Sequence, residues 1–188
     1  MIFAKLGRAF ALALTLTFGT AGSLLAHALP GTVVTMSQDG TALSVEIAVN
    51  VEDLVIAEPL LVPLETMASG HITAPDVIET LARYFEKHMT LYQAGAQVAL
   101  TLEDARLGAD QNEHVGQFAL LTVTFAGQTE EVTPEATMAL QYDAVMHEVR
   151  NHRAVVIWTD NSNSARTLAE FGFRSVNGQP ALVELNAP

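Results

Sequence analysis

The feature that constrains the fold most strongly is a strict alternation of apolar side chains over residues 42–51. Every second position is apolar, and the positions between carry small or polar side chains; the apolar ones are Leu43, Val45, Ile47, Val49 and Val51. A period of two is typical of a strand with one buried face, because successive side chains of an extended chain point to opposite sides. The Asp39-Gly40 pair before this segment predicts a tight hairpin to an earlier strand at residues 32–38.

Further short apolar segments predict more strands along the chain. They lie at residues 97–102, 115–125, 136–142, 153–159, 169–173 and 181–185. One amphipathic helix is predicted near residues 74–90, where apolar side chains recur at helical spacing. Residues 54–64 contain two prolines and are expected to form an edge strand or an extended crossover. The expected fold is mainly β, an antiparallel β-sandwich of the immunoglobulin-like type with one inserted α-helix.

The N-terminal segment, residues 1–28, is predicted to be a cleaved secretory signal peptide. Two basic residues precede an uncharged apolar run, and small residues follow at Ala26 and Ala28. Cleavage after Ala28 is favoured because alanines then fill both small-residue positions, while cleavage after Ala26 stays open. About 160 residues remain, the size of one domain, so residues 29–188 are expected to form a single periplasmic domain.

The charge balance and composition exclude several classes of partner. The chain has 9 Lys and Arg against 21 Asp and Glu, a formal net charge of −12, which argues against sequence-independent binding of nucleic acid. It contains no cysteine, so disulfides and thiolate metal ligands are excluded. No apolar stretch after the signal reaches the length of a membrane span, so we expect no membrane insertion of the mature chain. A membrane or periplasmic protein is the expected type of partner.

The densest polar cluster stands directly before the strand expected at residues 153–159. His147 and His152 are five positions apart in it, and imidazole binds Ni, Cu and Zn alike. On a regular strand this spacing would send the rings to opposite faces, so a shared ion requires a loop that turns both inward. We predict a divalent transition-metal site on His147 and His152, in a candidate binding corner with Tyr142, Asp143, Glu148, Arg150, Asn151 and Arg153.

Other interpretations of these residues stay open. The polar corner can instead satisfy backbone groups where strands turn, without any ligand. Three further histidines, His71, His88 and His114, can join the pair only if the fold brings them close; His88 lies near the apolar face of the predicted helix, which is typical of a packed histidine. The methionines show no clustered spacing and are interpreted as core residues rather than as copper ligands.

Several stretches resemble one known family. They are Ala-His-Ala-Leu-Pro at residues 26–30, the helix ending at residues 83–91, and Gln-Tyr-Asp-Ala-Val-Met-His at residues 141–147 leading into residues 151–154. They are similar to the extracytoplasmic β-rich segment of HupE/UreJ-type hydrogenase and urease accessory proteins. The resemblance implies a role linked to the handling of nickel or another transition metal. Permease activity is not expected, because that family's transport role is attributed to membrane helices that do not occur in this sequence.

The sequence carries no signature of a familiar enzyme class. It contains no G-x-S-x-G elbow, no G-x-G-x-x-G and no P-loop. The favoured interpretation is therefore an exported, non-enzymatic accessory or binding domain linked to transition-metal handling. One alternative is a metal-dependent hydrolase that uses His147 and His152, with Glu148 or Asp143 as the base. The other is a structural protein-interaction module.

Overall fold

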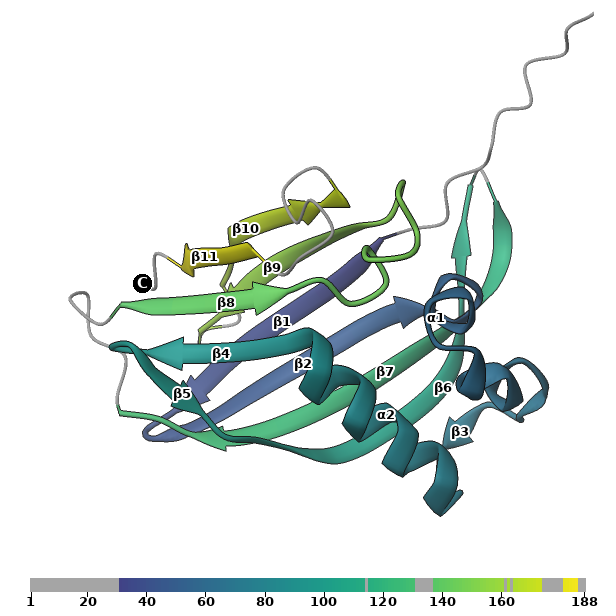
Figure 1. Cartoon of the computed structure of the whole chain (residues 1–188), viewed down its shortest axis with the longest axis horizontal. Coiled ribbons are helices and arrows are strands. Elements are labelled where there is room, and N and C mark those ends of the chain that lie inside the picture. Colours follow the sequence, from purple (N-terminus) through teal and green to yellow (C-terminus); the bar gives the residue numbers. More distant parts are fainter. Residues whose placement is uncertain are drawn as a thin grey trace, which may run out of the picture.

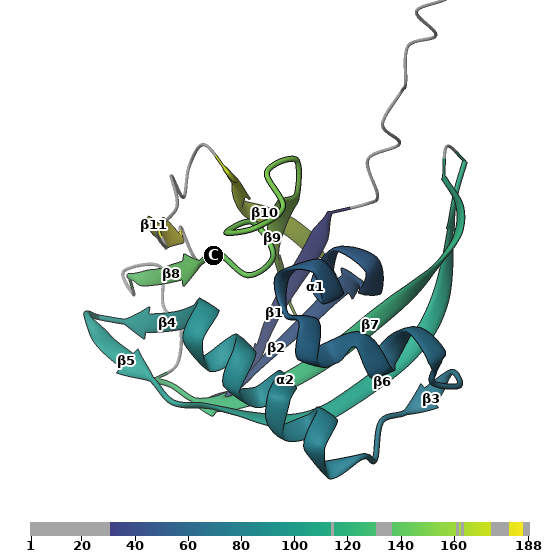
Figure 2. The ribbon, with the colours of Figure 1, turned by 45° about the vertical axis from the view of Figure 1, so that its right-hand side comes forward.

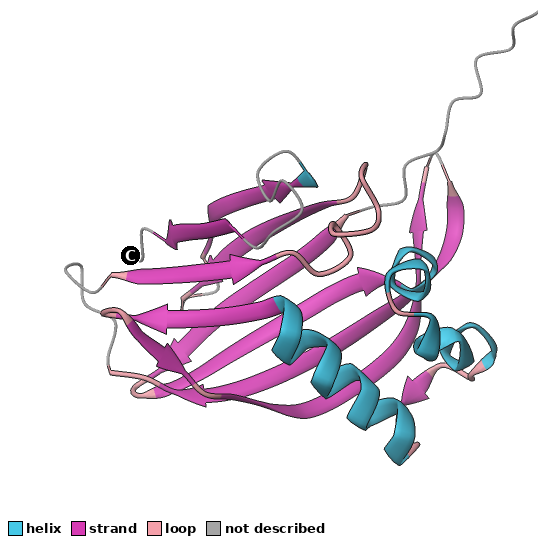
Figure 3. Cartoon of the chain, in the orientation of Figure 1, coloured by secondary structure: helices cyan, strands magenta, loops and turns pink. Residues whose placement is uncertain are grey.

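The structure is mainly β, as the sequence predicts (Figures 1 and 3). It is a computed structural model that describes residues 31–113, 115–130, 137–160, 162, 164–173 and 181–185. The predicted signal peptide at residues 1–28, with both of its cleavage sites, and His114 lie outside the described residues. In the described part of the chain, no helix combines the length and the apolar character needed to cross a membrane.

The described residues form two sheets, and the larger has seven strands in the order β10-β9-β1-β2-β7-β6-β3. Its strands are β1 (Thr32–Asp39), β2 (Ala42–Asn50), β3 (Gly70–His71), β6 (Leu100–Asn112), β7 (Gly116–Gln128), β9 (Arg153–Thr159) and β10 (Ala165–Gly172). The predicted hairpin is confirmed: Asp39 pairs with Ala42, and Gly40 at the turn has a φ of +59°. The buried face predicted for Leu43, Val45, Ile47 and Val49 is also confirmed, since each is at most 2% exposed.

One pairing departs from the expected antiparallel arrangement. β1 runs parallel to β9, with Thr32 opposite Ala154 and Met36 opposite Trp158. Parallel neighbours cannot be joined by a tight turn and need a long connection. Here almost the whole domain lies between the two strands, so the local pattern of residues gave no sign of the pairing.

The smaller sheet has four strands in the order β11-β8-β4-β5. They are β4 (Met89–Gln93), β5 (Ala96–Val98), β8 (Met138–Tyr142) and β11 (Ala181–Leu185). This sheet and the long helix lie over one face of the larger sheet (Figures 1 and 2). Aromatic contacts join the layers: the Phe85 and Phe125 ring centroids are 5.6 Å apart, and those of Tyr142 and Phe171 are 6.0 Å apart. Burying each such ring contributes about 1.5–3 kcal/mol to folding.

Three helices lie in the described residues, where one was expected. The predicted helix near residues 74–90 is confirmed as α2 (Pro75–His88). The prediction of an extended segment at residues 54–64 is wrong. Two helices occupy this stretch, α1 (Val51–Ala57) and the 3-10 helix η1 (Pro59–Thr66). Asn50 begins α1 by accepting the Asp53 N–H at 2.8 Å, and Pro59 stands at the start of η1, where a missing N–H costs no hydrogen bond.

Candidate metal centre

The register between β4 and β8 places His88 opposite Asp143. Met89 pairs with Tyr142 in this antiparallel ladder, and the Asp143 N–H donates to the His88 carbonyl at 3.1 Å. The residue that ends α2 therefore faces the residue that follows β8. Their side chains meet as well: His88 Nδ1 lies 2.7 Å from Asp143 Oδ1, with side chains 8% and 6% exposed.

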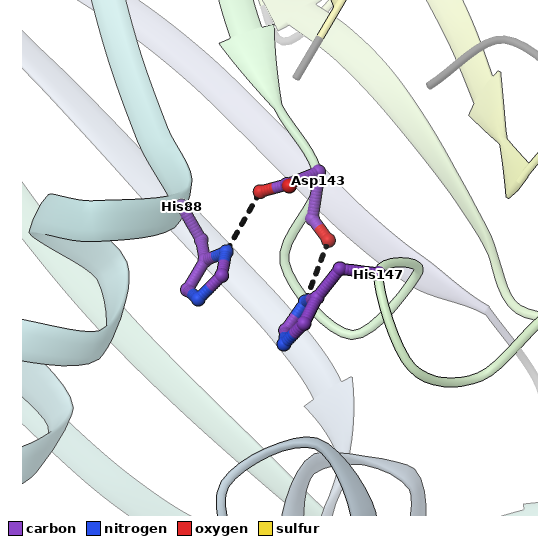
Figure 4. Close-up of side chains that lie close together, drawn as sticks. All are labelled: His88, Asp143 and His147. Atoms are coloured by element: carbon purple, nitrogen blue, oxygen red, sulfur yellow. Dashed lines mark hydrogen bonds and ion pairs between the residues drawn. The ribbon is translucent and has the colours of Figure 1, made fainter. Parts of the chain in front are cut away.

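A tight turn after β8 folds His147 back over this pair. The His147 N–H and its ring Nδ1 each lie 3.1 Å from the Asp143 carbonyl oxygen. The His147 ring then stacks on His88, with centroids 4.0 Å apart and planes at 12°. One ligand atom from each of His88, Asp143 and His147 lies within 4.8 Å of the other two (Figure 4). We call these three residues the His-Asp-His cluster.

The hydrogen bonds to Asp143 engage the Nδ1 atom of each ring. A carbonyl oxygen only accepts, so Nδ1 of His147 is a donor, and an ionised Asp143 carboxylate likewise accepts from Nδ1 of His88. Nε2 of each ring is the nitrogen that these bonds leave for a ligand. Figure 4 shows both of these nitrogens on the side away from Asp143. Carboxylates and carbonyls orient metal-binding histidines in this same manner.

Tyr84 packs against the two imidazoles from α2. Its ring centroid lies 4.8 Å from that of His88 and 6.1 Å from that of His147. Its hydroxyl accepts the Val145 N–H at 2.7 Å. Burial raises the pKa of Tyr84 above its ordinary value, and the nearby Asp143 carboxylate adds to the effect, so the hydroxyl stays protonated. His147 is the partly exposed member of the cluster, and an ion from solvent would approach past it.

The second predicted ligand, His152, is engaged elsewhere. Its side chain is 0% exposed, and Nδ1 lies 2.7 Å from Asp53 Oδ2. Nε2 accepts the Thr32 N–H at 3.2 Å and lies 2.8 Å from the Thr32 hydroxyl. Both ring nitrogens thus hold the start of β1 and the first turn of α1 to the residue before β9. The structure brings His147 to His88 and Asp143, and it brings His152 to Asp53 and Thr32.

The remaining members of the predicted corner fall into two groups. Tyr142 is buried within the sheet interface, and burial raises the pKa of its hydroxyl, which lies near Thr32 but makes no hydrogen bond to a described residue. Asp143 belongs to the His-Asp-His cluster. The other four are exposed: Glu148, Arg150, Asn151 and Arg153.

His71, a further candidate, lies on the edge strand β3. Its Nδ1 is 2.9 Å from Asp104 Oδ1, and Arg106 Nε is 3.0 Å from the other oxygen of that carboxylate. The side chain of His71 is 67% exposed. Among the described histidines, the structure therefore places only His88 and His147 side by side.

Comparisons with known proteins add no assignment, since no protein-family model and no curated protein matches the chain. Sequence reasoning named His147 and Asp143 directly but gave His88 only as a residue that the fold could bring close. The signal that was missed is the register of β4 with β8: a helix that ends in histidine and runs straight into a strand places that histidine at the end of a ladder. Tyr84 carried no sequence signal for its contact with Val145.

Proposed function

We propose that this protein is a non-enzymatic accessory domain that binds a divalent transition metal, Ni, Cu or Zn, through the His-Asp-His cluster. His88 and His147 would supply their Nε2 atoms. Asp143 would hold both rings in place, with its carboxylate on one Nδ1 and its carbonyl on the other. In this proposal His152 has a structural role, because a metal would have to displace its bonds to Asp53 and Thr32.

The proposal rests on one observation above all, the pairing of both Nδ1 atoms with acceptors of a single residue. The rings have centroids 4.0 Å apart, and their Nε2 atoms lie on the same side, away from Asp143. Imidazole nitrogens bind these metals at about 2.0–2.1 Å along a lone pair that lies in the ring plane. The two rings, whose planes are now at 12°, would therefore have to turn well away from parallel to point both lone pairs at one ion. Nitrogen ligands do not select among the three metals.

Titration of the purified chain with Ni(II), Cu(II) and Zn(II) tests the proposal. We expect stoichiometric binding of at least one of the three, and for Cu(II) an electron paramagnetic resonance spectrum with hyperfine coupling to two nitrogens. His147→Gln should weaken binding at least about tenfold, and Asp143→Asn about tenfold or more, because the His88 ring loses the carboxylate that orients it while the backbone carbonyl still holds His147. His71→Gln is the matched control, since it removes an exposed histidine that is also bound to a carboxylate.

Equal affinity in the wild type, His147→Gln and His71→Gln would overturn the proposal. His147 is partly exposed, so its replacement should leave the fold intact, and circular dichroism checks this. If His152→Gln alone abolished binding while remaining folded, the ligand that the sequence predicts, His152, would be the correct one.

The hydrolase alternative is less well supported by the same geometry. A general base needs a carboxylate or an imidazole free to take a proton from water. Asp143 already accepts from His88, and Glu148 is exposed on the turn. Turnover of ester or phosphoester substrates by the metal-loaded protein, lost in Asp143→Asn, would restore that alternative.

We propose further that the domain is exported to the periplasm after removal of residues 1–28, and that its two sheets form an immunoglobulin-like sandwich. The resemblance to HupE/UreJ-type accessory proteins supports a link to metal handling and a membrane or periplasmic protein as partner. The N-terminal sequence of the protein isolated from the periplasm tests the export: a chain that begins at Leu29 supports it, and an intact Met1 in the cytoplasm contradicts it.

A further inference from the structure

A separate cavity lies outside the His-Asp-His cluster, between the loop that precedes β9 and the end of β10. Its volume is about 630 Å³, and it is lined by Arg150, Asn151, His152, Arg153, Glu170 and residues 171–173. We propose that this cavity binds a small organic carboxylate, with Arg150 and Arg153 as the groups that recognise the anion.

The charge of the cavity runs against that of the whole protein. The chain carries a net charge of −12, yet two arginines and one glutamate line this cavity. Elsewhere, Arg83 and Arg106 each pair with a carboxylate at 3.0 Å. Arg150 and Arg153 make no ion pair with any residue that the structure describes, although Glu170 lines the same cavity. Within the described part of the chain, no carboxylate competes with an anion for their N–H groups.

Arg150 is held in position by an aromatic ring. Its guanidinium carbon lies 5.2 Å from the centroid of Phe173, within the range of a cation–π contact. Such a contact uses the face of the ring and leaves guanidinium N–H groups able to donate. Two N–H groups of one arginine match the two oxygens of a carboxylate, which makes arginine better suited than lysine to this recognition.

The same residues favour a singly charged organic anion over an inorganic dianion. The negative charge of Glu170 offsets that of one of the two arginines, so the residues that line the cavity have a net charge of +1. Phe173 is partly exposed and supplies an apolar wall, while Asn151 offers an amide at the rim. The His152 ring contributes no ligand atom here, since both of its nitrogens are bonded within the protein. This site is therefore independent of the metal proposal.

The test uses benzoate as the probe and follows backbone amide resonances of the isotope-labelled protein by nuclear magnetic resonance. We expect saturable shifts at Asn151 and Gly172 with benzoate, weaker binding of acetate and of inorganic phosphate, and no binding of the neutral isostere benzamide. Equal shifts with benzamide would overturn the role of the charge. Binding of phosphate as tight as that of benzoate would overturn the assignment to an organic carboxylate.

Arginine variants locate the site. Arg150→Gln and Arg153→Gln should each weaken benzoate binding about tenfold or more, because each removes a charge-assisted hydrogen-bond donor. Arg83→Gln, which changes an exposed arginine on α2, should leave benzoate binding unchanged. All three side chains are exposed, so the fold should persist. Equal benzoate affinity in all three variants and the wild type would overturn the proposal, whatever the outcome of the metal titration.

Discussion

The Tyr84 hydroxyl accepts the backbone N–H of Val145 at 2.7 Å, and this bond fastens α2 to the turn that carries Asp143 and His147. Val145 has a φ of +65°, a conformation that costs a β-branched residue on the order of 1–3 kcal/mol. Three features keep the turn in this conformation. The Tyr84 hydroxyl accepts the Val145 N–H, the Asp143 carbonyl accepts the His147 N–H, and the Val145 side chain is buried. The turn that carries Asp143 and His147 is therefore strained at Val145, and buried contacts with the rest of the protein hold it in place.

Tyr84→Phe should destabilise the protein by about 1–3 kcal/mol, because it leaves the buried Val145 N–H without its acceptor. Chemical denaturation measures the loss. Tyr92→Phe is the control, since the Tyr92 hydroxyl donates to the Gln141 side chain in a partly buried position, and it should cost less. If Tyr84→Phe left both stability and metal affinity at the wild-type values, the support ascribed to this bond would be wrong.

Asp53→Ala should cost about 1–3 kcal/mol, because the Nδ1–H of His152 would be buried without a partner. Glu52→Ala provides a matched control in the same first turn of α1, where its side chain is exposed. It should change stability by less than about 0.5 kcal/mol. Thermal or urea unfolding of the two variants decides the matter, and similar losses in both would contradict a structural role for the His152 bonds.

Gly31→Ala should weaken the pairing of β1 with β9. A Cβ at position 31 would collide with the backbone carbonyl of Arg153, and a backbone atom within a strand cannot move aside without disturbing the ladder. We expect a loss of about 1–3 kcal/mol. Gly108→Ala is the control, because its new Cβ would meet only the Leu120 carbonyl at 3.9 Å. Equal stability of the two variants would show that the close approach has no energetic weight.

Ala94→Asn should stabilise the turn between β4 and β5 by about 0.5–1 kcal/mol. Ala94 and Gly95 have φ values of +50° and +82°, and asparagine tolerates this left-handed region better than alanine. The position is exposed, so the change should disturb no packing. Ala96→Asn, at the first residue of β5, should not stabilise, since asparagine is disfavoured in strands. Calorimetry that found Ala94→Asn less stable than the wild type would refute the argument.

Asp104 should titrate below the ordinary range of an aspartate. The hydrogen bond from His71 holds the pKa of this carboxyl down, and the charge of Arg106 adds to it. Because the folded-state pKa is lowered, the stabilisation is present above the unfolded-state pKa and is lost as the pH falls through the folded-state pKa. In His71→Ala, carbon-detected magnetic resonance should find the Asp104 pKa moved upward.

Asp160 is the internal reference for that titration. Hydrogen bonds from Ser162 and Ser164 lower its pKa, and none of them involves His71. Its titration should be the same in the wild type and in His71→Ala. An Asp104 pKa that did not change in the variant would show that His71 is not the cause.

The residues of β2 illustrate what the sequence could predict about the fold. The alternation from Leu43 to Val49 specified a strand with one buried face, and Asp39-Gly40 specified its hairpin, because both signals act between neighbours in the chain. Residues 54–64 form helices instead of the expected extended segment. Two prolines are compatible with either structure, and the side-chain caps at Asn50 and Glu58 favour the helices. The parallel partner of β1 could not be read locally at all.

The site shows the same limit. Asp143 and His147 are four positions apart in one turn, so local chemistry pointed to them. His88 joins them across 55 residues, through a register that depends on which strand β4 selects. His152, close to His147 in sequence, is turned into the interior by its bonds to Asp53 and Thr32. Spacing along the chain therefore indicated the correct corner without distinguishing the ring that faces its neighbours from the ring that is locked inside.

The parallel pair of β1 with β9 sets an order in which the sheet can assemble. β1 can join β2 as soon as the hairpin between them emerges, but its other edge stays open until a strand far along the chain arrives; the bond from Thr32 to His152 closes a separation of 120 residues. Contacts so distant in sequence form slowly because a long loop must close first. A chain delivered N-terminus first would therefore expose this edge until β9 arrives, and a chaperone that covers extended backbone could bind β1 there.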